Sequence, residues 1–207
     1  GARWTTEYNR RDLPTRATDP NGNTVTAAYD AGGNMVSFSD PRNGTTTWVY
    51  DPSNRLSARS DPVAATETFT YDVGGNLSTY VDRMGQLTKY TYDALGRLTN
   101  IGYGATTSSP NAFSSTTTFT YDGGDRVVQV DDSRAGAIGR SYDQLNRLVS
   151  EITPQGTVTY TYDSLGRRAS MSAPSQATTT YTFDNPNLLS SISRGTTTIS
   201  LVDDASA

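Results

Sequence analysis

Seven copies of the dipeptide Tyr-Asp place carboxylates at regular intervals along this 207-residue chain, and paired carboxylates are the groups that hydrolyse a glycosidic bond. The copies are Tyr29-Asp30, Tyr50-Asp51, Tyr71-Asp72, Tyr92-Asp93, Tyr121-Asp122, Tyr142-Asp143 and Tyr162-Asp163. An aspartate that starts a turn accepts hydrogen bonds from its own backbone, and seven identical copies favour that structural role. The two adjacent pairs, Asp131-Asp132 and Asp203-Asp204, would point to opposite faces of a strand. We therefore expect no catalytic residue.

Other chemistry is limited by the residue types that the chain lacks. It has no histidine and no cysteine, which removes imidazole bases and the usual ligands of zinc, haem and iron–sulfur clusters. The segment Asp19-x-Asn21-x-Asn23 resembles the start of a calcium loop, but no closing glutamate follows and the other repeats do not keep it. We expect no metal and no cofactor. A formal charge of −4 with scattered arginines also argues against a nucleic-acid partner.

The regular spacing of the Tyr-Asp pairs predicts the architecture of the chain. Successive Tyr-Asp pairs lie 21, 21, 21, 29, 21 and 20 residues apart, and degenerate copies follow the same interval at Tyr8-Asn9 and Phe183-Asp184. Such a period indicates repeated supersecondary units. The sequence predicts nine units in a single repeat region over residues 1–207, with an irregular insertion at about residues 101–115, where a longer loop leaves one edge of the sheet.

Each unit is predicted to be a β-hairpin. Four residues after the aromatic comes a residue that tolerates a left-handed backbone, which suits a type I turn followed by a bulge. These residues are Asp12, Gly33, Asn54, Gly75, Gly96, Asp125, Asn146, Gly166 and Asn187. The period-2 alternation of rings with threonines predicts an aromatic face and a threonine-rich face on every strand. We expect an all-β fold of consecutive antiparallel hairpins in a curved or spiralling sheet.

The hairpin geometry also predicts which residues face one another across the strands. The motif aspartate should face an arginine in five units, as Asp51 faces Arg55, and the tyrosine should face the following residue, as Tyr50 faces Leu56. Two residues before the tyrosine, six of eight side chains are aromatic, and short side chains are expected opposite them. The expected partners of positions 27, 48, 69, 90, 119, 140, 160 and 181 are Ser37, Ala58, Thr79, Asn100, Gln129, Ser150, Ser170 and Ser191.

The hairpins should be joined by short turns such as Asp19-Pro20-Asn21-Gly22, which has the residue preferences of a type I turn. Short turns at both ends require a continuous antiparallel meander. Its two edge strands, near residues 4–8 and 196–201, are expected to lack partners and to invite strand addition. No run of roughly 18 apolar residues that could span a membrane is present, and residues 1–10 lack the apolar segment of a signal peptide.

These units resemble the YD repeats of the RHS family. The segment Tyr92 to Leu98 (YDALGRL) is similar to that family's pattern Y-D-x-x-G-R-L, as are Tyr142 to Leu148 (YDQLNRL) and Tyr162 to Arg167 (YDSLGR). The family includes bacterial RHS toxins, toxin-complex C components, wall-associated proteins and teneurins. The resemblance implies a strip of hairpins that spirals into a hollow shell around a toxic domain, in a bacterial protein that is secreted or displayed at the cell surface.

The resemblance has limits that narrow the expected role. No segment after Phe183 resembles the family's capping and self-cleaving segment, so the chain is expected to be a section of wall. Eighteen strands at roughly 4.8 Å make a strip about 85 Å wide, which closes into a ring about 27 Å across. A compact 100-residue domain is about 33 Å across, so enclosure requires further repeats from a longer precursor or from other copies.

Two alternatives of other classes remain open at this point. Tyr103 and Phe113, in the irregular insertion, are the candidates for exposed aromatic side chains that stack on carbohydrate, which would make the chain an adhesive or sugar-binding module. The open edges would alternatively let copies assemble into a surface fibre. We predict a non-enzymatic wall or scaffold whose partners are further YD repeats and, if it encloses one, a toxin domain.

Overall fold

The computed structural model describes residues 3–42, 44–63, 65–185 and 188–201, and the elements among them are all β-strands. The strands are β1 (Thr5–Tyr8), β2 (Pro14–Thr18), β3 (Thr24–Tyr29), β4 (Met35–Asp40), β5 (Gly44–Tyr50), β6 (Leu56–Ser60), β7 (Glu67–Tyr71), β8 (Leu77–Val81), β9 (Leu87–Tyr92), β10 (Leu98–Ala105), β11 (Ser115–Tyr121), β12 (Val127–Asp132), β13 (Gly136–Tyr142), β14 (Leu148–Thr153), β15 (Gly156–Tyr162), β16 (Arg168–Ser172), β17 (Thr179–Asn185), β18 (Leu188–Arg194) and β19 (Thr197–Ser200). The all-β prediction is confirmed. In the described part of the chain there is no helix that could cross a membrane.

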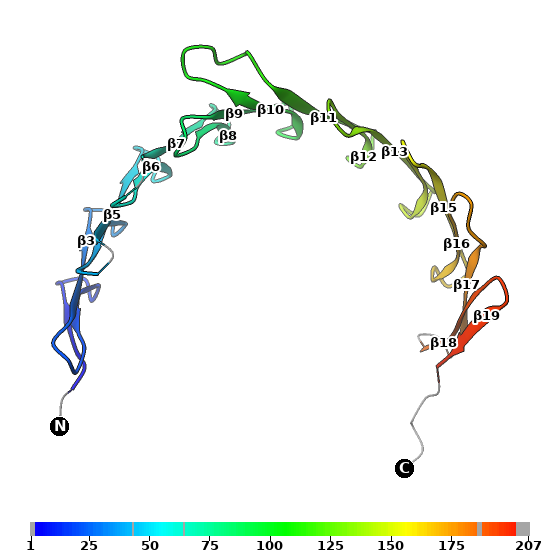
Figure 1. The fold of residues 1–207 in the computed structure, drawn as a ribbon, viewed down its shortest axis with the longest axis horizontal. Helices are drawn as coiled ribbons and strands as arrows, with labels where there is room; N and C mark the ends of the chain where they lie inside the picture. The colour runs from blue at the N-terminus through cyan, green and yellow to red at the C-terminus, as the bar shows by residue number, and fades with distance from the viewer. Residues whose placement is uncertain (1–2, 43, 64, 186–187, 202–207) are drawn as a thin grey trace. The chain divides into compact units, whose positions relative to one another are not determined.

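The strands follow one another as antiparallel neighbours. Residues 1–115 form one compact unit that holds β1 to β10, and residues 116–207 form a second that holds the later strands. In the first unit each strand pairs with the next from β1 to β10, and in the second unit from β11 to β19. Figure 1 shows the succession of hairpins along the ribbon. The meander is confirmed within each unit, and a single region spanning both stays a prediction.

The hairpin turns have the predicted geometry. In the third hairpin the backbone N–H of Asn54 donates to the carbonyl of Asp51 at 2.9 Å, and the N–H of Asp51 donates to the carbonyl of Arg55 at 2.8 Å. Asn54 has φ of 67°, the left-handed value that the type I turn with a bulge requires. Positive φ occurs at all the equivalent described positions: Asp12, Gly33, Asn54, Gly75, Gly96, Asp125, Asn146 and Gly166. Asn187 lies outside the described residues.

Beyond the pair of residues nearest to each hairpin turn, the predicted strand register is wrong by one residue. Tyr50 faces Leu56 as expected, but a bulge follows and leaves Ser57 unpaired, so Trp48 faces Arg59 and not Ala58. A bulge places two residues of one strand against one of its partner, which shifts every later pair. The same shift occurs in the other hairpins, and the observed pairs are Ala27–Phe38, Trp48–Arg59, Phe69–Tyr80, Tyr90–Ile101, Phe119–Val130, Arg140–Glu151, Tyr160–Met171 and Tyr181–Ile192.

This shift changes what each face of the sheet contains. The short residues predicted to face the rings, Ser37, Ala58, Thr79, Asn100, Gln129, Ser150, Ser170 and Ser191, instead face the residue that precedes each repeat aromatic. Large side chains therefore meet on the aromatic face, where the rings of Phe69 and Tyr80 stack with centroids 5.2 Å apart. From Tyr29 onward the repeat aromatics are half-buried, whereas the residue before each one is exposed, which confirms the two-faced alternation.

The insertion differs from the predicted loop. Strand β10 continues to Ala105, so the irregular part is shorter than residues 101–115, and it folds back over the threonine-rich face (green in Figure 1). Phe113 lies against Gly102, where a Cβ atom would be 2.5 Å from the ring, and Lys89 donates to Asn111 at 2.8 Å. Ala105 faces Leu87, and these two are the buried apolar residues among those described. The insertion thus gives one stretch of the sheet a second layer.

The turns that join one hairpin to the next lie at the other end of the strands from the hairpin turns, and successive joining turns pack on one another. In the joint at Asp19 the N–H of Gly22 donates to the carbonyl of Asp19 at 3.0 Å, as predicted. A Cβ atom on Gly44 would lie 2.5 Å from Pro62 of the following joint, one on Gly136 2.8 Å from Pro154, and one on Gly156 2.4 Å from Pro174. The prolines of these joints therefore require glycine in the joint before.

Gly44→Ala is expected to lower the free energy of unfolding by about 2 kcal/mol, because it combines a left-handed φ with a collision against Pro62. Gly22→Ala is the matched control. Its φ of 85° is close to the 83° of Gly44, but no atom lies within 4 Å of the added Cβ, so it should cost only about 1 kcal/mol. Urea titrations of both variants measure the difference, and equal losses would show that the Gly44–Pro62 packing contributes nothing.

Candidate functional site

The contacts between one repeat and the next form the most regular arrangement of side chains in the molecule. Six repeat tyrosines donate their hydroxyl to a backbone carbonyl of the preceding hairpin, at the residue that faces that hairpin's own tyrosine. These bonds are Tyr29 to Pro14 at 3.0 Å, Tyr50 to Met35 at 3.2 Å, Tyr71 to Leu56 at 2.8 Å, Tyr92 to Leu77 at 3.0 Å, Tyr142 to Val127 at 3.0 Å and Tyr162 to Leu148 at 2.7 Å. Each tyrosine thus ties its hairpin to the one before.

Arginines make a second set of contacts between neighbouring repeats. In four repeats the guanidinium pairs with the aspartate of its own turn and lies over the ring of the next repeat aromatic. The distances to the ring centroid are 4.3 Å for Arg55 and Tyr71, 4.9 Å for Arg126 and Tyr142, 4.5 Å for Arg147 and Tyr162, and 4.2 Å for Arg167 and Phe183. A cation over a ring contributes about 0.5–1 kcal/mol at exposed sites. We call the tyrosine and arginine contacts together the inter-repeat ladder.

The motif aspartates organise the turns from which the ladder arginines extend. In the third hairpin, Oδ1 of Asp51 accepts from the backbone N–H groups of Ser53 and Arg55, both at 2.9 Å, and Oδ2 accepts from the Arg55 guanidinium at 2.7 Å. The side chain of Arg55 lowers the pKa of Asp51, with further help from the backbone N–H groups. In the turns that begin at Asp30 and Asp72, an asparagine takes the place of the arginine. The side-chain amides of Asn34 and Asn76 lower the pKa of these two aspartates in the same way.

The lowered pKa values predict how stability depends on pH. A carboxylate with a lower pKa in the folded state stabilises the fold above its unfolded value, here 3.8, and this contribution is lost as the pH falls through the folded value. The chain has no histidine, so no side chain with an ordinary pKa titrates between about pH 5 and 8. Thermal melts should therefore show a constant midpoint from pH 8 to pH 5 and a fall below about pH 4. A marked fall between pH 6 and pH 5 would contradict this assignment.

The carboxylates considered for catalysis or for a metal bond neighbouring groups in the part of the chain that the structure describes. Within the described part of the chain, no cluster of three potential metal ligands occurs. Asp19 accepts from the N–H groups of Asn21 and Asn23, both at 2.8 Å, and from the Asn23 amide at 2.6 Å, which is the geometry of a turn and not of a calcium loop. Asp132 bonds Thr117 at 2.9 Å, while Asp131 bonds Gln129 at 2.8 Å. Asp203 and Asp204 lie outside the described residues.

The two aromatic residues proposed to bind a ligand do not come together. Tyr103 is 36% exposed, whereas Phe113 is half-buried and packs on Gly102. Because Gly102 and Tyr103 are consecutive in β10, the rings of Tyr103 and Phe113 belong to opposite faces of the strand. A shared stacking platform is therefore absent from this arrangement, and a sugar-binding role for either residue stays a prediction.

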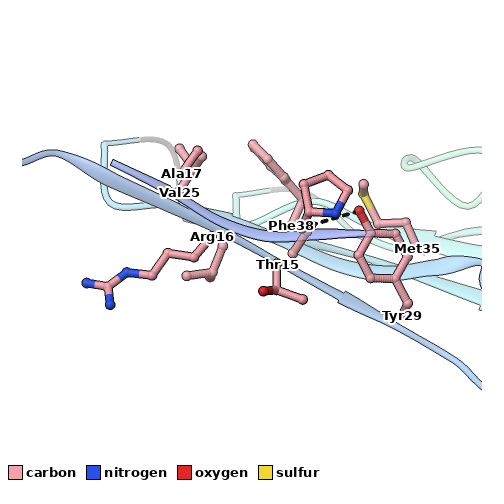
Figure 2. Close-up of a pocket in the computed structure, with 10 residues that line it drawn as sticks. Thr15, Arg16, Ala17, Val25, Tyr29, Met35 and Phe38 are labelled. Carbon is pink, nitrogen blue, oxygen red and sulfur yellow. Dashed lines mark hydrogen bonds between the residues drawn. The ribbon is translucent and has the colours of Figure 1, made fainter. Parts of the chain in front are cut away.

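An apolar groove lies on the aromatic face of β2, β3 and β4, with a volume of about 190 Å³. It arises where Ala27 occupies the position that is aromatic in most other repeats. Figure 2 shows Ala17 and Val25 at one end of the groove, and Tyr29 and Met35 at the other. The groove is a local gap in the row of large side chains.

A charged cluster connects the third and fourth hairpins on the same face. Asp61 pairs with Arg59 at 3.2 Å and with Arg83, while the Arg83 Nε lies 3.3 Å from Glu67. The hydroxyl of Tyr80 donates to Glu67 at 3.0 Å. Every one of these side chains has a partner within the cluster, so it is best explained as a cross-link between repeats. Residue-type patterns did not reveal this cluster, because the bulge brings Arg59 to the aromatic face.

Comparison with known proteins relates these contacts to a family. The family model described as RHS Repeat matches residues 8–45, 29–66, 71–108 and 142–178, which together make up more than half of the chain. No curated protein sequence matches the chain.

Solved structures give weaker likenesses. The chain is similar to a chain of the TcdB2-TccC3-TEV crystal structure, with 14% identity over 91% of this chain and 14% of that chain and a TM-score of 0.43. It is also similar to the Tc holotoxin pore of Photorhabdus luminescens, with 20% identity over 82% of this chain and 9% of that chain and a TM-score of 0.48. A porin-like protein from Bacteroides uniformis aligns with 14% identity over 87% of this chain and 90% of that chain at a TM-score of 0.38. All three TM-scores lie below 0.5, so no functional conclusion is drawn from them.

Proposed function

Because this chain belongs to the RHS repeat family, we propose that it is a non-catalytic section of wall that encloses or scaffolds a polypeptide cargo in a secreted bacterial protein. The observation that carries this proposal is the inter-repeat ladder. Within each of the two compact units it joins neighbouring hairpins by hydroxyl contacts, guanidinium contacts or both, so the sheet extends by addition of repeats without a central core.

The two-faced sheet supports the same role. Aromatic and other large side chains gather on one face, while threonines and serines occupy the other, so the two sides of a wall would meet different surroundings. The motif carboxylates of Asp51, Asp93, Asp143 and Asp163 each accept from the backbone N–H and the guanidinium of the arginine in the same turn, which is a structural role. The chain spans only 14% and 9% of the two Tc chains to which it is similar.

The test uses the protein that the complete reading frame encodes. It is expressed whole, treated with a protease of broad specificity, and the survival of the segment after the repeats is followed by mass spectrometry. We expect that segment to resist digestion, and to become sensitive when Tyr71→Ala and Tyr142→Ala break two contacts of the ladder. Leu95→Ala, at an exposed turn position, is the matched control and should preserve resistance. Enclosure would be contradicted if the segment were digested as fast in the unsubstituted protein as in the variant with Tyr71→Ala and Tyr142→Ala.

A further inference from the structure

The insertion closes over the threonine-rich face through one aromatic ring. Gly102 in β10 is buried, and a Cβ atom there would lie 2.5 Å from Cδ1 and Cε1 of Phe113 and 2.6 Å from its Cγ. The ring therefore lies directly on the backbone of the strand, in a space that any side chain at position 102 would fill. Gly102 lacks the positive φ of the turn glycines, so the ring, and not the backbone conformation, requires glycine here.

The rest of the insertion is bonded mainly to itself. We call residues 106–114 the strap. Residues 106–112 are all exposed. The backbone N–H of Ser109 donates to the carbonyl of Thr106 at 3.1 Å, and the N–H of Ala112 donates to the carbonyl of Ser109 at 3.2 Å. The strap therefore has local structure that does not depend on the strands beneath it.

The strap is tied to the sheet near its C-terminal end. Lys89 of β9 donates to the side chain of Asn111 at 2.8 Å, and the N–H of Ser114 donates to the carbonyl of Tyr103 at 2.8 Å. Strands β9 and β10 pair with each other along their own backbones beneath these contacts. A segment with few buried contacts opens at a lower free energy than the paired strands below it. We therefore expect the strap to open while the strands stay paired.

We propose that the surface over Gly102 is a slot for an aromatic ring, that Phe113 occupies it when the strap is closed, and that local opening of the strap frees it. The occupant indicates the ligand, which is an aromatic side chain of another polypeptide segment. Lys89 faces Gly102, and Leu87, two residues earlier in β9, lies on the same face and is buried against Ala105. An apolar side chain therefore borders the slot. This binding site goes beyond the wall role and is tested apart from it.

Amide hydrogen exchange tests whether the strap opens alone, with the N–H of Ser114 as the reporter of closure. In the parent, this amide should exchange at least about tenfold faster than the protected amides of β9. Phe113→Ala removes the ring, and Gly102→Ala displaces it without altering the strap. Both should accelerate exchange at Ser114 by about tenfold or more and leave β9 unchanged.

The matched control is Gly139→Ala, at a glycine within β13 where the added Cβ would lie 3.8 Å from Ile152, an ordinary contact. It should leave exchange at Ser114 unchanged. If Ser114 and β9 accelerate together in Phe113→Ala and in Gly102→Ala, the strap opens only with the sheet and the proposal is overturned. It is also overturned if Gly102→Ala has no effect at Ser114.

A second experiment tests the slot itself. N-acetylphenylalanine amide is titrated into Phe113→Ala, and the NMR shift of the amide at position 102 is followed, with N-acetylalanine amide as the control compound. We expect a saturable shift with the phenylalanine compound, at least about tenfold weaker binding in the parent, and no binding when Gly102→Ala is added to Phe113→Ala. Equal responses to both compounds, or no saturable shift in Phe113→Ala, overturn the proposal. Neither result changes the digestion of the segment after the repeats, so the slot and the wall can fail separately.

Discussion

Tyr71→Ala is expected to lower the free energy of unfolding by about 3 kcal/mol, which places it among the severe single substitutions. The change removes a half-buried ring, the hydroxyl bond to the Leu56 carbonyl at 2.8 Å, and the surface on which Arg55 lies at 4.3 Å. It leaves that carbonyl without its partner in the ladder. Urea denaturation followed by circular dichroism measures the loss.

Tyr71→Phe separates the hydroxyl from the ring. It keeps the ring beneath Arg55 and removes only the bond to Leu56, so we expect a loss of about 1 kcal/mol. A result in which phenylalanine is as damaging as alanine would assign the whole effect to the hydroxyl. A result in which alanine costs less than about 1 kcal/mol would show that the ladder does not hold the repeats together.

Leu87→Ala is expected to cost about 3 kcal/mol, for a different reason. Leu87 is 5% exposed and faces Ala105 on the side of the sheet that the insertion covers, so its truncation leaves a cavity between two layers. Leu95→Ala is the control of the same chemical change at a side chain that is 73% exposed, and it should alter stability by less than about 0.5 kcal/mol. Equal losses in the two variants would show that the insertion is not a packed layer.

The parts of this fold that depend on local chemistry could be predicted from the sequence. The 21-residue interval, the aspartate at the start of each turn and the residue of positive φ three positions later specify the hairpin almost completely, because each acts within one turn. The pairing of Tyr50 with Leu56 follows directly. The pairing of Trp48 does not, because the bulge at Ser57 has no sequence signal of its own.

Contacts between repeats were predictable only in part. The arginine of each turn was expected to pair with its own aspartate, and Arg147 does so at 2.7 Å. That the same guanidinium also lies over Tyr162 depends on how far the side chain reaches into the next hairpin. One signal was present: Tyr71 lies 15 residues after Leu56, and this spacing recurs with little change along the chain. The insertion that covers Leu87 has no periodic sequence pattern, so the sequence predicts only a longer loop that leaves the edge of the sheet.

Whether neighbouring repeats hold each other through the ladder is tested most directly by a double-mutant cycle on Arg147 and Tyr162. Arg147→Met, Tyr162→Leu and the double variant are compared with the parent by urea titration, which isolates the energy that the two side chains share. With the guanidinium 4.5 Å from the ring centroid, we predict a coupling of about 0.5–1 kcal/mol. Strictly additive losses, with no coupling between the two positions, would contradict the account.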